Sequence, residues 1–435
     1  MRACQRVARV SVVAVVGLGY VGLPLATRAA EVGHTVIGLD SDETKLSALG
    51  LGCSHVEDVS DERLAAVMRE GRFRLVLATP TQGDPARYDY GFNGFDIGII
   101  TVPTPLEDGK PDLSYVEGAA RTLGRRLRPG GVVVLESTSY PGTTEGLVAD
   151  VLLEESGLQP EVDYHLGFSP ERIDPGNEQH DFETTPKLVS GTDAAALAAV
   201  ESFYAGLVKE TVPVSSPTVA ECAKLFENIF RQVNVALVNE MATLAHDLDI
   251  DFWQVLDAAA SKPYGFMKFT PGPGVGGHCI PVDPGYFTWF AQRRLGRSSR
   301  FIELAQEVNE GMPGYVVERA EEMLGRSGLL GAQVLVLGVS YKKGTADQRK
   351  SPGRSIVDLL LDAGALVTVT DPYARNWTAT TSLDASEAAG RAADFDLVIL
   401  ATDHDEFDFE AIGRSARLVL DCRRRMPANE SVHTL

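Results

Sequence analysis

The residue types best suited to covalent chemistry in this sequence lie in the segment Gly276–Asp283, which reads Gly-Gly-His-Cys-Ile-Pro-Val-Asp. The two glycines let a ligand come close to the backbone, and Asp283 follows Cys279 by four residues. A cysteine thiolate is a strong nucleophile and later a good leaving group, which suits it to covalent catalysis. The alternative is an inert loop thiol, which is the commoner case for an isolated loop cysteine.

A second pair of polar residues, Lys224 and Asn228, interrupts a long apolar helical pattern. Because they are four residues apart, they share one face of the predicted helix. An ammonium and an amide on one face can stabilise negative charge that develops on an oxygen atom. The alternative is a lysine whose stem lies on the helix while its ammonium reaches solvent.

A third signal is the segment Gly17–Gly22, a GxGxxG pattern that follows a predicted strand. Gly17 permits a tight turn, Gly19 lets a pyrophosphate approach the backbone, and Gly22 lets the next helix pack on the sheet. The next strand ends at Asp40, where a carboxylate binds a ribose hydroxyl and repels a 2′-phosphate. The pattern therefore predicts an NAD site and favours NAD over NADP.

The elements that must position these residues follow a strand–helix alternation in both halves of the chain. Four strands are predicted in the first half, and two of its helices are predicted at Leu23–Glu31 and Tyr115–Leu127; the strands are Val10–Val16, Thr35–Leu39, Ile97–Val102 and Val132–Glu136. Four more strands follow, at Val334–Leu337, Val367–Thr370, Leu397–Leu400 and Leu418–Leu420. The expected fold class is α/β, with two Rossmann-like, doubly wound parallel-sheet domains joined by a long central helix.

That central helix is predicted over Pro217–Asp247, because apolar residues recur there at helical spacing without proline or glycine interruption. Its apolar residues occupy more than one face, so we expect a homodimer built on it. The expected domains are 1–212 for NAD, 213–315 for the helix and the cysteine loop, and 316–435 for a second, smaller α/β domain. The Gly-, Tyr- and Pro-rich segment Thr79–Phe95 is predicted to be a surface loop.

Composition excludes several classes of partner. The formal net charge of −20 argues against nucleic acid and anionic membranes as partners. The five cysteines are scattered and show no CxxC spacing, so we expect neither a disulfide framework nor a metal site. We expect a cytoplasmic setting. The run Val10–Val16 after three arginines is interpreted as a buried strand, not as a signal peptide.

Seven ordered motifs together resemble the UDP-glucose / UDP-N-acetylhexosamine 6-dehydrogenase family, from about Val10 to Cys422. They are Gly17–Gly22, Thr101–Pro105, Glu136–Thr138 with Pro141–Thr144, Phe168–Arg172, Glu221–Asn228, Gly276–Pro284, and Tyr341–Lys343 with Asp347, Arg349, Ser351 and Pro352. The sequences of Pro271–Val275 and Glu307–Pro313, with His278 before the cysteine, most resemble the N-acetylhexosamine branch.

The resemblance implies an NAD-dependent four-electron oxidation of a nucleotide-diphosphate sugar at C6, through a thiohemiacetal and a thioester on the cysteine. The catalytic residues that it implies are Cys279, Lys224, Asn228, Asp283, Glu171 and Thr138. The residues expected to bind NAD are Gly17, Gly19, Tyr20, Val21, Gly22, Asp40, Lys45, Thr104 and Thr138. Those expected to bind the substrate are Glu171, Arg172, Lys224, Asn228, Phe269, Gly272, Gly276, Lys343 and Arg349.

This sequence departs from the family pattern at Gly344, where aspartate commonly follows the lysine pair, and at Lys262-Pro263, where many UDP-glucose enzymes have an arginine. The sugar and the base therefore stay open, and UDP- or TDP-glucose is an alternative to a UDP-N-acetylhexosamine. A β-hydroxyacid dehydrogenase would share the lysine–asparagine pair without needing Cys279 or the C-terminal domain. A non-catalytic NAD-binding scaffold would share only the glycine motif.

Overall fold

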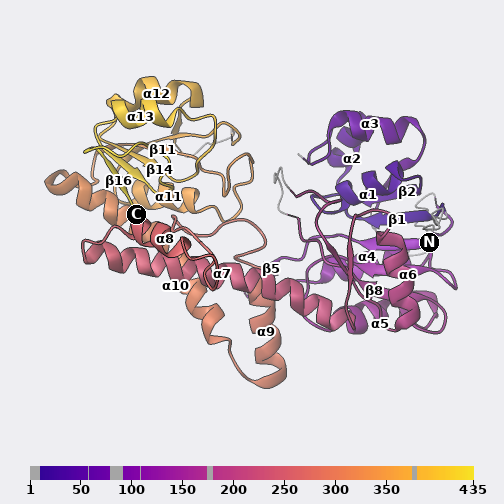
Figure 1. Cartoon of the computed structure of the whole chain (residues 1–435). Helices are drawn as coiled ribbons and strands as arrows, with labels where there is room; N and C mark the ends of the chain where they lie inside the picture. The colour runs from indigo at the N-terminus through magenta and orange to yellow at the C-terminus, as the bar shows by residue number, and fades with distance from the viewer. Residues whose placement is uncertain (1–9, 57, 79–91, 108, 174–179, 375–379) are drawn as a thin grey trace. The chain divides into compact units, whose positions relative to one another are not determined.

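The computed structural model describes residues 10–56, 58–78, 92–107, 109–173, 180–374 and 380–435. The chain divides into two compact units, Met1–Phe226 and Glu227–Leu435, and the division falls inside a single helix. That helix, α7, spans Pro217–Asp247, as the apolar periodicity predicted (Figure 1). Most of the loop predicted over Thr79–Phe95 lies outside the described residues.

The first unit is built on a six-stranded parallel sheet with the order β3-β2-β1-β4-β7-β8. The strands are β1 (Val12–Val16), β2 (Thr35–Asp40), β3 (Phe73–Leu77), β4 (Ile97–Ile100), β7 (Val132–Leu135) and β8 (His165–Phe168). Strands β1 and β4 pair at the point where the strand order reverses. In a doubly wound sheet this reversal point is where a ligand binds, beyond the carboxyl ends of the strands.

Helices cover both faces of this sheet. They are α1 (Gly22–Glu31), α2 (Glu43–Gly50), α3 (Asp61–Arg69), α4 (Ser114–Gly124), the π-helix Thr144–Val148, α5 (Ala149–Ser156) and α6 (Ala194–Tyr204). Apolar residues of α1, α3 and α6 form one buried cluster with the sheet, and those of α4 and α5 form a second cluster on the other face. Figure 1 shows α1 and α4 on opposite sides of the strands.

Two short ribbons flank the first sheet. Strands β5 (Leu106–Glu107) and β6 (Lys110–Pro111) form an antiparallel pair after the end of β4. Strands β9 (Lys187–Val189) and β10 (Thr211–Pro213) form a parallel pair, so the chain after β8 returns close to the ends of the main strands.

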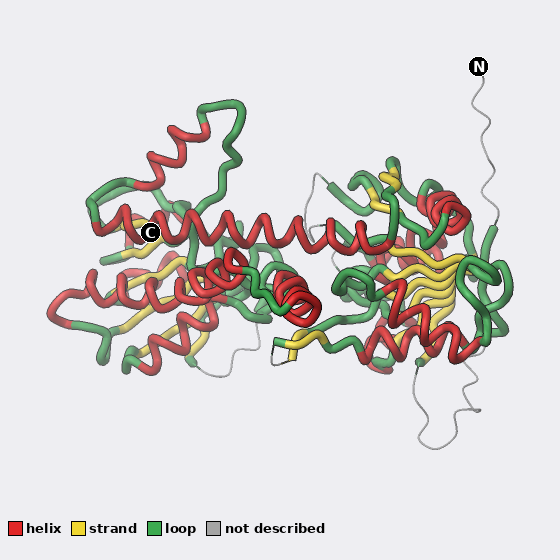
Figure 2. Tube along the Cα trace, turned by 90° about the horizontal axis from the view of Figure 1, so that it is seen from below, coloured by secondary structure: helices red, strands yellow, loops and turns green. Residues whose placement is uncertain are grey.

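The second unit contains a second parallel sheet, with the order β13-β12-β11-β14-β15-β16, which repeats the winding of the first. Its strands are β11 (Gln333–Leu337), β12 (Leu366–Thr370), β13 (Thr381–Ser382), β14 (Leu397–Leu400), β15 (Val419–Asp421) and β16 (Val432–Thr434). Figure 2 shows the strands of each sheet side by side with helices beside them. The predicted pair of doubly wound sheets and the long helix are thus confirmed.

Further helices follow α7 in the second unit, and some of them cover its sheet. They are α8 (Phe252–Ala260), α9 (Asp283–Leu295), α10 (Arg300–Leu324), α11 (Pro352–Asp362), α12 (Ala388–Arg391) and α13 (Phe409–Ser415), with 3-10 turns at Gly325–Ser327, Ala385–Glu387 and Ala392–Asp394. Helices α10 and α11 cover one face, and α12 and α13 cover the other. Within the described ranges, no helix combines the length and apolar character that crossing a membrane requires.

Candidate functional site

The glycine loop after β1 has the shape of a pyrophosphate cradle. Gly17 has a φ of +98°, and a Cβ on Gly22 would stand 1.8 Å from the Gly17 carbonyl oxygen, so neither position accepts a side chain. A Cβ on Gly19 would meet nothing within 4 Å, which leaves open space above the backbone there. Helix α1 begins with neither an acidic residue in its first turn nor a side-chain cap, so its N-terminal charge suits an anion.

Asp40 stands at the end of β2 beside this cradle. Its Oδ2 accepts hydrogen bonds from the Leu18 amide and the Lys45 ammonium, each at 2.8 Å. Burial favours the neutral acid, but these bonds and one from the Asp42 amide outweigh it and hold the pKa of Asp40 below its ordinary value. A charged carboxylate at this position suits the ribose of NAD and opposes a 2′-phosphate.

Three predicted site residues follow neighbouring strands of the first sheet. Thr104 lies in the loop after β4, Thr138 in the loop after β7, and Glu171 in the loop after β8. Because these strands are parallel and adjacent, their carboxyl ends meet at one edge of the sheet. The structure thus groups these residues at the edge that also carries the glycine loop.

Glu171 belongs to a buried ionic network that the sequence reasoning missed. The Lys187 ammonium lies 2.8 Å from Glu171 Oε2 and 3.1 Å from Glu136 Oε2. The hydroxyl of Tyr204 donates to Glu136 Oε1. The guanidinium of the neighbouring Arg172 donates to the Pro186 carbonyl.

Lys224 is nine-tenths buried on α7, and among the described residues no carboxylate lies within salt-bridge distance of its ammonium. One turn earlier, Glu221 is fully buried and accepts hydrogen bonds from the amides of Gly142 and Thr144 and from the Thr144 hydroxyl. Burial raises the pKa of Glu221. Glu221 therefore anchors the start of α7 and orients the turn that carries Lys224.

Cys279 lies in the loop that leads into α9 and is half-buried. Its carbonyl oxygen accepts the amides of Val282 and Asp283, at 3.1 and 2.8 Å, so the loop closes into a turn at the helix start. Gly277 has a φ of +89°, and its amide donates to the Arg349 carbonyl at 3.0 Å. These bonds hold the loop on the segment that follows β11.

Two residues of the predicted catalytic set, Asn228 and Asp283, are in direct contact. Asn228 Nδ2 donates to Asp283 Oδ2 at 2.6 Å, and both residues are buried. The bond links the helix that carries Lys224 to the residue four positions after Cys279. The second N–H of the same amide nitrogen remains as a donor that an oxyanion can use.

Buried amides fix the beginning of the cysteine loop. Asn239 accepts the Gly272 amide at 3.0 Å and donates to Asn309 Oδ1 at 2.9 Å. A Cβ on Gly272 would stand 2.8 Å from a guanidinium nitrogen of Arg423, so this arginine lies against the loop. Phe269 packs edge-on against Phe230 with ring centroids 5.8 Å apart. Asn239 and Arg423 were not predicted from the sequence.

Arg349 also supports the cysteine loop through its side chain, which lies 2.6 Å from Asp347 and 3.1 Å from His278 Nδ1. Lys343 is about half exposed and pairs with Asp405 at 3.2 Å. The loop that carries Lys343 is held by His404, whose Nδ1 accepts the Gly344 amide at 3.2 Å.

That acceptance places the proton of His404 on Nε2, which lies 3.1 Å from Asp371 and 2.8 Å from the Ser340 hydroxyl. Asp371 also accepts the amides of Val339 and Ser340. His404 and Asp371 therefore fasten the loop after β11 to the ends of β12 and β14. The sequence reasoning did not identify either residue.

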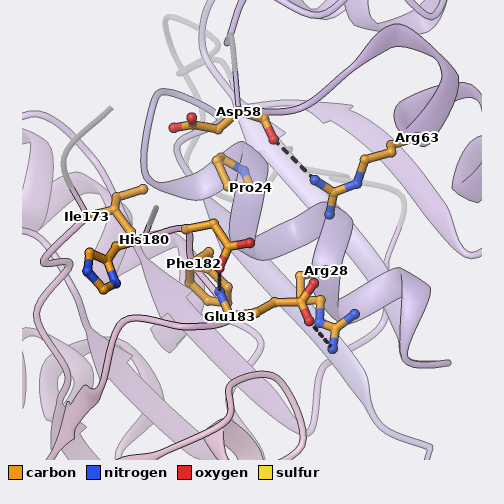
Figure 3. Close-up of a pocket in the computed structure, with 9 residues that line it drawn as sticks. Pro24, Arg28, Asp58, Arg63, Ile173, His180, Phe182 and Glu183 are labelled. Carbon is orange, nitrogen blue, oxygen red and sulfur yellow. Dashed lines mark hydrogen bonds and ion pairs between the residues drawn. The ribbon is translucent and has the colours of Figure 1, made fainter. Parts of the chain in front are cut away.

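A small hollow in the first unit (Figure 3) is lined in part by Ile173 and Phe182, which contact Glu171 and Lys187. Its described lining includes Pro24, Arg28, Asp58, Arg63, Phe182 and Glu183. Arg28 pairs with Glu183 at 2.9 Å, and Arg63 pairs with Glu31 at 2.8 Å. Because the arginines are already neutralised by acids, we assign no ligand to it.

The predicted residues are distributed over both units. The first unit holds Gly17–Gly22, Asp40, Lys45, Thr104, Thr138, Glu171, Arg172 and Lys224, and the second holds Asn228, Phe269, Gly272, Gly276, Cys279, Asp283, Lys343 and Arg349. Helix α7 carries Lys224 in the first unit and Asn228, one turn later, in the second.

Three domain models of one family match the chain. The NAD binding domain of the UDP-glucose/GDP-mannose dehydrogenase family matches residues 11–208, its central domain matches 218–311, and its UDP binding domain matches 335–427.

Curated relatives resemble the chain over nearly its whole length. A UDP-N-acetyl-D-mannosamine dehydrogenase of Pyrococcus horikoshii is 35% identical over 419 residues, which cover 94% of this chain and 95% of the relative. A UDP-N-acetyl-D-glucosamine 6-dehydrogenase of Pseudomonas aeruginosa is 34% identical over 435 residues, which cover 96% of this chain and 98% of the relative.

Solved structures agree with these matches. The UDP-D-ManNAc dehydrogenase structure from Pyrococcus horikoshii superposes with a TM-score of 0.84 at 31% identity, covering 97% of this chain and 98% of that one. A UDP-glucose dehydrogenase structure from Pyrobaculum islandicum gives a TM-score of 0.83 at 31% identity, covering 96% and 95%.

Proposed function

The chain belongs to the UDP-glucose/GDP-mannose dehydrogenase family and is an NAD-dependent nucleotide-sugar dehydrogenase, and we propose that it oxidises a UDP-N-acetylhexosamine at C6 through a covalent intermediate on Cys279. The overall change converts one primary alcohol, one water and two NAD⁺ into one carboxylate, two NADH and three protons. Bound NAD⁺ accepts the hydride in each oxidation. The open backbone at Gly19 and the charged Asp40 fit that cofactor.

The observation that carries the proposal is the bond between Asn228 and Asp283. It ties the helix of Lys224 to the first residue of α9, whose amide in turn bonds to the Cys279 carbonyl. A thiol, an amide and an ammonium are therefore supplied by two connected elements, in a family whose members oxidise nucleotide sugars.

Each residue then has a chemical task. The alcohol is first oxidised to an aldehyde, and the Cys279 thiolate adds to its carbonyl carbon to give a thiohemiacetal. Loss of a second hydride gives a thioester, which water hydrolyses. Lys224 and Asn228 stabilise the oxyanion that develops in each step. Asp283 and Thr138 order a water and move protons, and Glu171 takes a proton from the hydrolytic water.

Substrate binding is assigned mainly to positively charged side chains and to segments where the backbone lets the ligand approach closely. Lys343 and Arg349 are proposed to attract the diphosphate or to hold the residues that surround it. Arg172 is proposed to contact the same ligand. Phe269, Gly272 and Gly276 are proposed to line the sugar's path. The contact of Arg423 with Gly272 supports this assignment, because it adds a cation to the same loop.

The N-acetylhexosamine is favoured because relatives over the full length are named for N-acetylmannosamine and N-acetylglucosamine. UDP- or TDP-glucose is the second candidate, because the Pyrobaculum structure is named for UDP-glucose. The match of a UDP binding domain supports uridine as the base. The β-hydroxyacid alternative has no use for that domain.

The test is NADH production from the purified chain with UDP-GlcNAc, UDP-ManNAc, UDP-glucose and TDP-glucose. We expect two NADH per sugar consumed and the highest kcat/KM with an N-acetyl sugar. Comparable rates with UDP-glucose would contradict the choice of sugar and leave the reaction intact. A chain that binds NAD and oxidises none of the four sugars would instead support the scaffold alternative.

We also propose the division into an NAD domain (1–212), a central domain (213–315) and a nucleotide-sugar domain (316–435). The three matched ranges support it. The reaction is assigned to the cytoplasm. The four cysteines that the structure describes, Cys53, Cys222, Cys279 and Cys422, form no disulfide with one another, in keeping with a reducing compartment.

A homodimer through α7 is proposed from the large apolar side chains that this helix exposes. Phe230, Leu237, Met241 and Leu244 are each at least 40% exposed, and their spacing places them along one side of the helix. An exposed apolar stripe of this length is typical of a protein interface, and a second copy of the chain offers the same stripe.

Replacing Leu237 and Met241 together with aspartate is expected to convert a dimer into a monomer at micromolar concentration. Two carboxylates on the stripe would have to be buried without partners if the interface formed. Light scattering after size-exclusion chromatography measures the mass. Leu51→Asp, at a leucine that is 84% exposed in the first unit, is the matched control and should leave the dimer intact. A monomeric unaltered chain would contradict the proposal.

A further inference from the structure

Lys187 is a buried ammonium held between two carboxylates. It begins β9 and is 3% exposed, while Glu136 directly follows β7 and Glu171 follows β8 by three residues. Its Nζ lies 2.8 Å from Glu171 and 3.1 Å from Glu136. The ammonium therefore joins the ends of two adjacent parallel strands at the edge of the sheet where the candidate site lies.

Every oxygen of the two carboxylates has a partner in this network. Glu171 Oε1 accepts the amides of Arg172 and Ile173, at 2.7 and 2.9 Å, and Oε2 accepts Lys187. Glu136 Oε2 accepts Lys187, and Oε1 accepts the Tyr204 hydroxyl. Because buried charges are costly unless they are paired, these bonds fix the direction of the Glu171 carboxylate.

The two acids are not equivalent. Burial raises the pKa of Glu136 to about 7. Burial also acts on Glu171, but the charge of Lys187 and the hydrogen bonds from Lys187 and two amides outweigh it and lower its pKa. Glu171 is also the more exposed of the two, at 8% against 2%. The ammonium thus favours one ionised carboxylate, that of Glu171.

We propose that Lys187 is a positioning residue for hydrolysis of the thioester, because it keeps Glu171 ionised and fixed for proton transfer. This inference rests on the proposed function. In that step the water oxygen bonds to the thioester carbon, and the carbon–sulfur bond breaks. The electron pair leaves with the Cys279 sulfur, and one water proton goes to Glu171.

The network matters for this step more than for hydride transfer, because hydrolysis needs a base that is charged before the water attacks. Without the ammonium, two buried carboxylates would face each other at the same position and would share a proton. Glu171 would then be neutral in part of the molecules and free to turn away from the water.

The test follows the acyl-enzyme in the full-length chain after mixing with NAD⁺ and the nucleotide sugar that the panel selects. Stopped-flow absorbance measures the NADH burst and the steady rate, and intact-protein mass spectrometry measures the adduct on Cys279. Glu171→Gln and Lys187→Met are both expected to give a normal burst, a steady rate about 100-fold lower, and an accumulated adduct. Lys187→Arg, which keeps the charge, is expected to recover most of the steady rate.

Two further variants separate positioning from folding. Lys187→Met leaves uncompensated buried carboxylates, whereas Lys187→Met combined with Glu136→Gln removes one of them and protects the fold. The double variant is still expected to accumulate the adduct. Lys209→Met, at an exposed lysine beside β10, is the matched control and should turn over as the unaltered chain does.

The inference is overturned if the double variant, folded by circular dichroism, accumulates no adduct and keeps the steady rate of the unaltered chain while Glu171→Gln accumulates the adduct. An equal loss of burst and steady rate would likewise overturn it, because that pattern indicates a general structural role. If the unaltered chain oxidises no nucleotide sugar, the proposed function fails and the role of Lys187 fails with it.

Discussion

Replacing Cys279 with serine is expected to abolish uronic acid formation, with a loss of at least roughly 10³-fold in the steady rate. A serine hydroxyl is not ionised near neutral pH and adds poorly to an aldehyde. In a serine ester the alkoxide would also be a worse leaving group than the thiolate of a cysteine thioester. The first hydride transfer needs no thiol, so one NADH per sugar remains accessible and the aldehyde is the expected product. Product analysis by mass spectrometry with an NADH count measures both.

The control for this variant is Cys53→Ser, which changes an exposed thiol of the first unit. It should keep two NADH per sugar. NAD binding should be the same in both variants, because the glycine cradle and Asp40 lie in the first unit and Cys279 in the second. Uronic acid made by Cys279→Ser at the normal rate would disprove the covalent mechanism.

The parts of the fold that local patterns determine were predictable. Strand β1 and the glycines after it are adjacent in sequence, and only glycine fits at Gly22, so the cradle could be predicted from one short segment. Helix α7 was predictable to its end residues because 31 residues carry one uninterrupted apolar period. The carboxyl-terminal sheet repeats the pattern of the first, so its central strands were recognisable as well.

Strands β3 and β8 were missed for physical reasons. β3 is an edge strand whose five residues alternate irregularly between buried and exposed, so it lacks the continuous apolar run of a central strand. β8 is only four residues long and contains a glycine, whose added Cβ would stand 2.3 Å from the Ser190 carbonyl oxygen. The close approach that stabilises β8 therefore removes the side chain that would have marked it.

Predicted ends of elements moved where a side chain competes with the backbone. Strand β4 was predicted to Val102 but ends at Ile100. The Thr101 hydroxyl donates to the Gly17 and Val16 carbonyls, which turns the chain toward the glycine loop. That contact joins two segments 84 residues apart, and no local period in the sequence reports it.

The candidate site divides in the same way. Cys279, Lys224 and Asn228 were found because their residue types and spacing are unusual in their surroundings. Lys187 and Asn239 were not found, because a lysine at a strand start and an asparagine in a helix are ordinary until their distant partners are known. Sequence spacing thus identifies reactive groups more readily than it identifies the groups that hold them in place.

Replacing Lys224 with methionine is the second change with a large expected effect, a fall in kcat of about 10² to 10³-fold. Methionine keeps the length and the apolar stem of the side chain and removes the charge that opposes the oxyanion. Both oxidations develop negative charge on oxygen, so the NADH burst and the steady rate should fall together. This differs from the Lys187 variants, in which only the steady rate falls. Stopped-flow absorbance measures both phases.

Stability should move in the opposite direction to activity. The Lys224 ammonium is nine-tenths buried and has no carboxylate within salt-bridge distance among the described residues, so its burial is a cost that the folded chain carries. The methionine variant removes that cost, and its Tm should equal or exceed that of the unaltered chain. Lys209→Met, an exposed lysine of the same unit, should change neither quantity. A methionine variant that loses both activity and stability would show that Lys224 supports the fold, and the oxyanion role would then have to pass to Asn228.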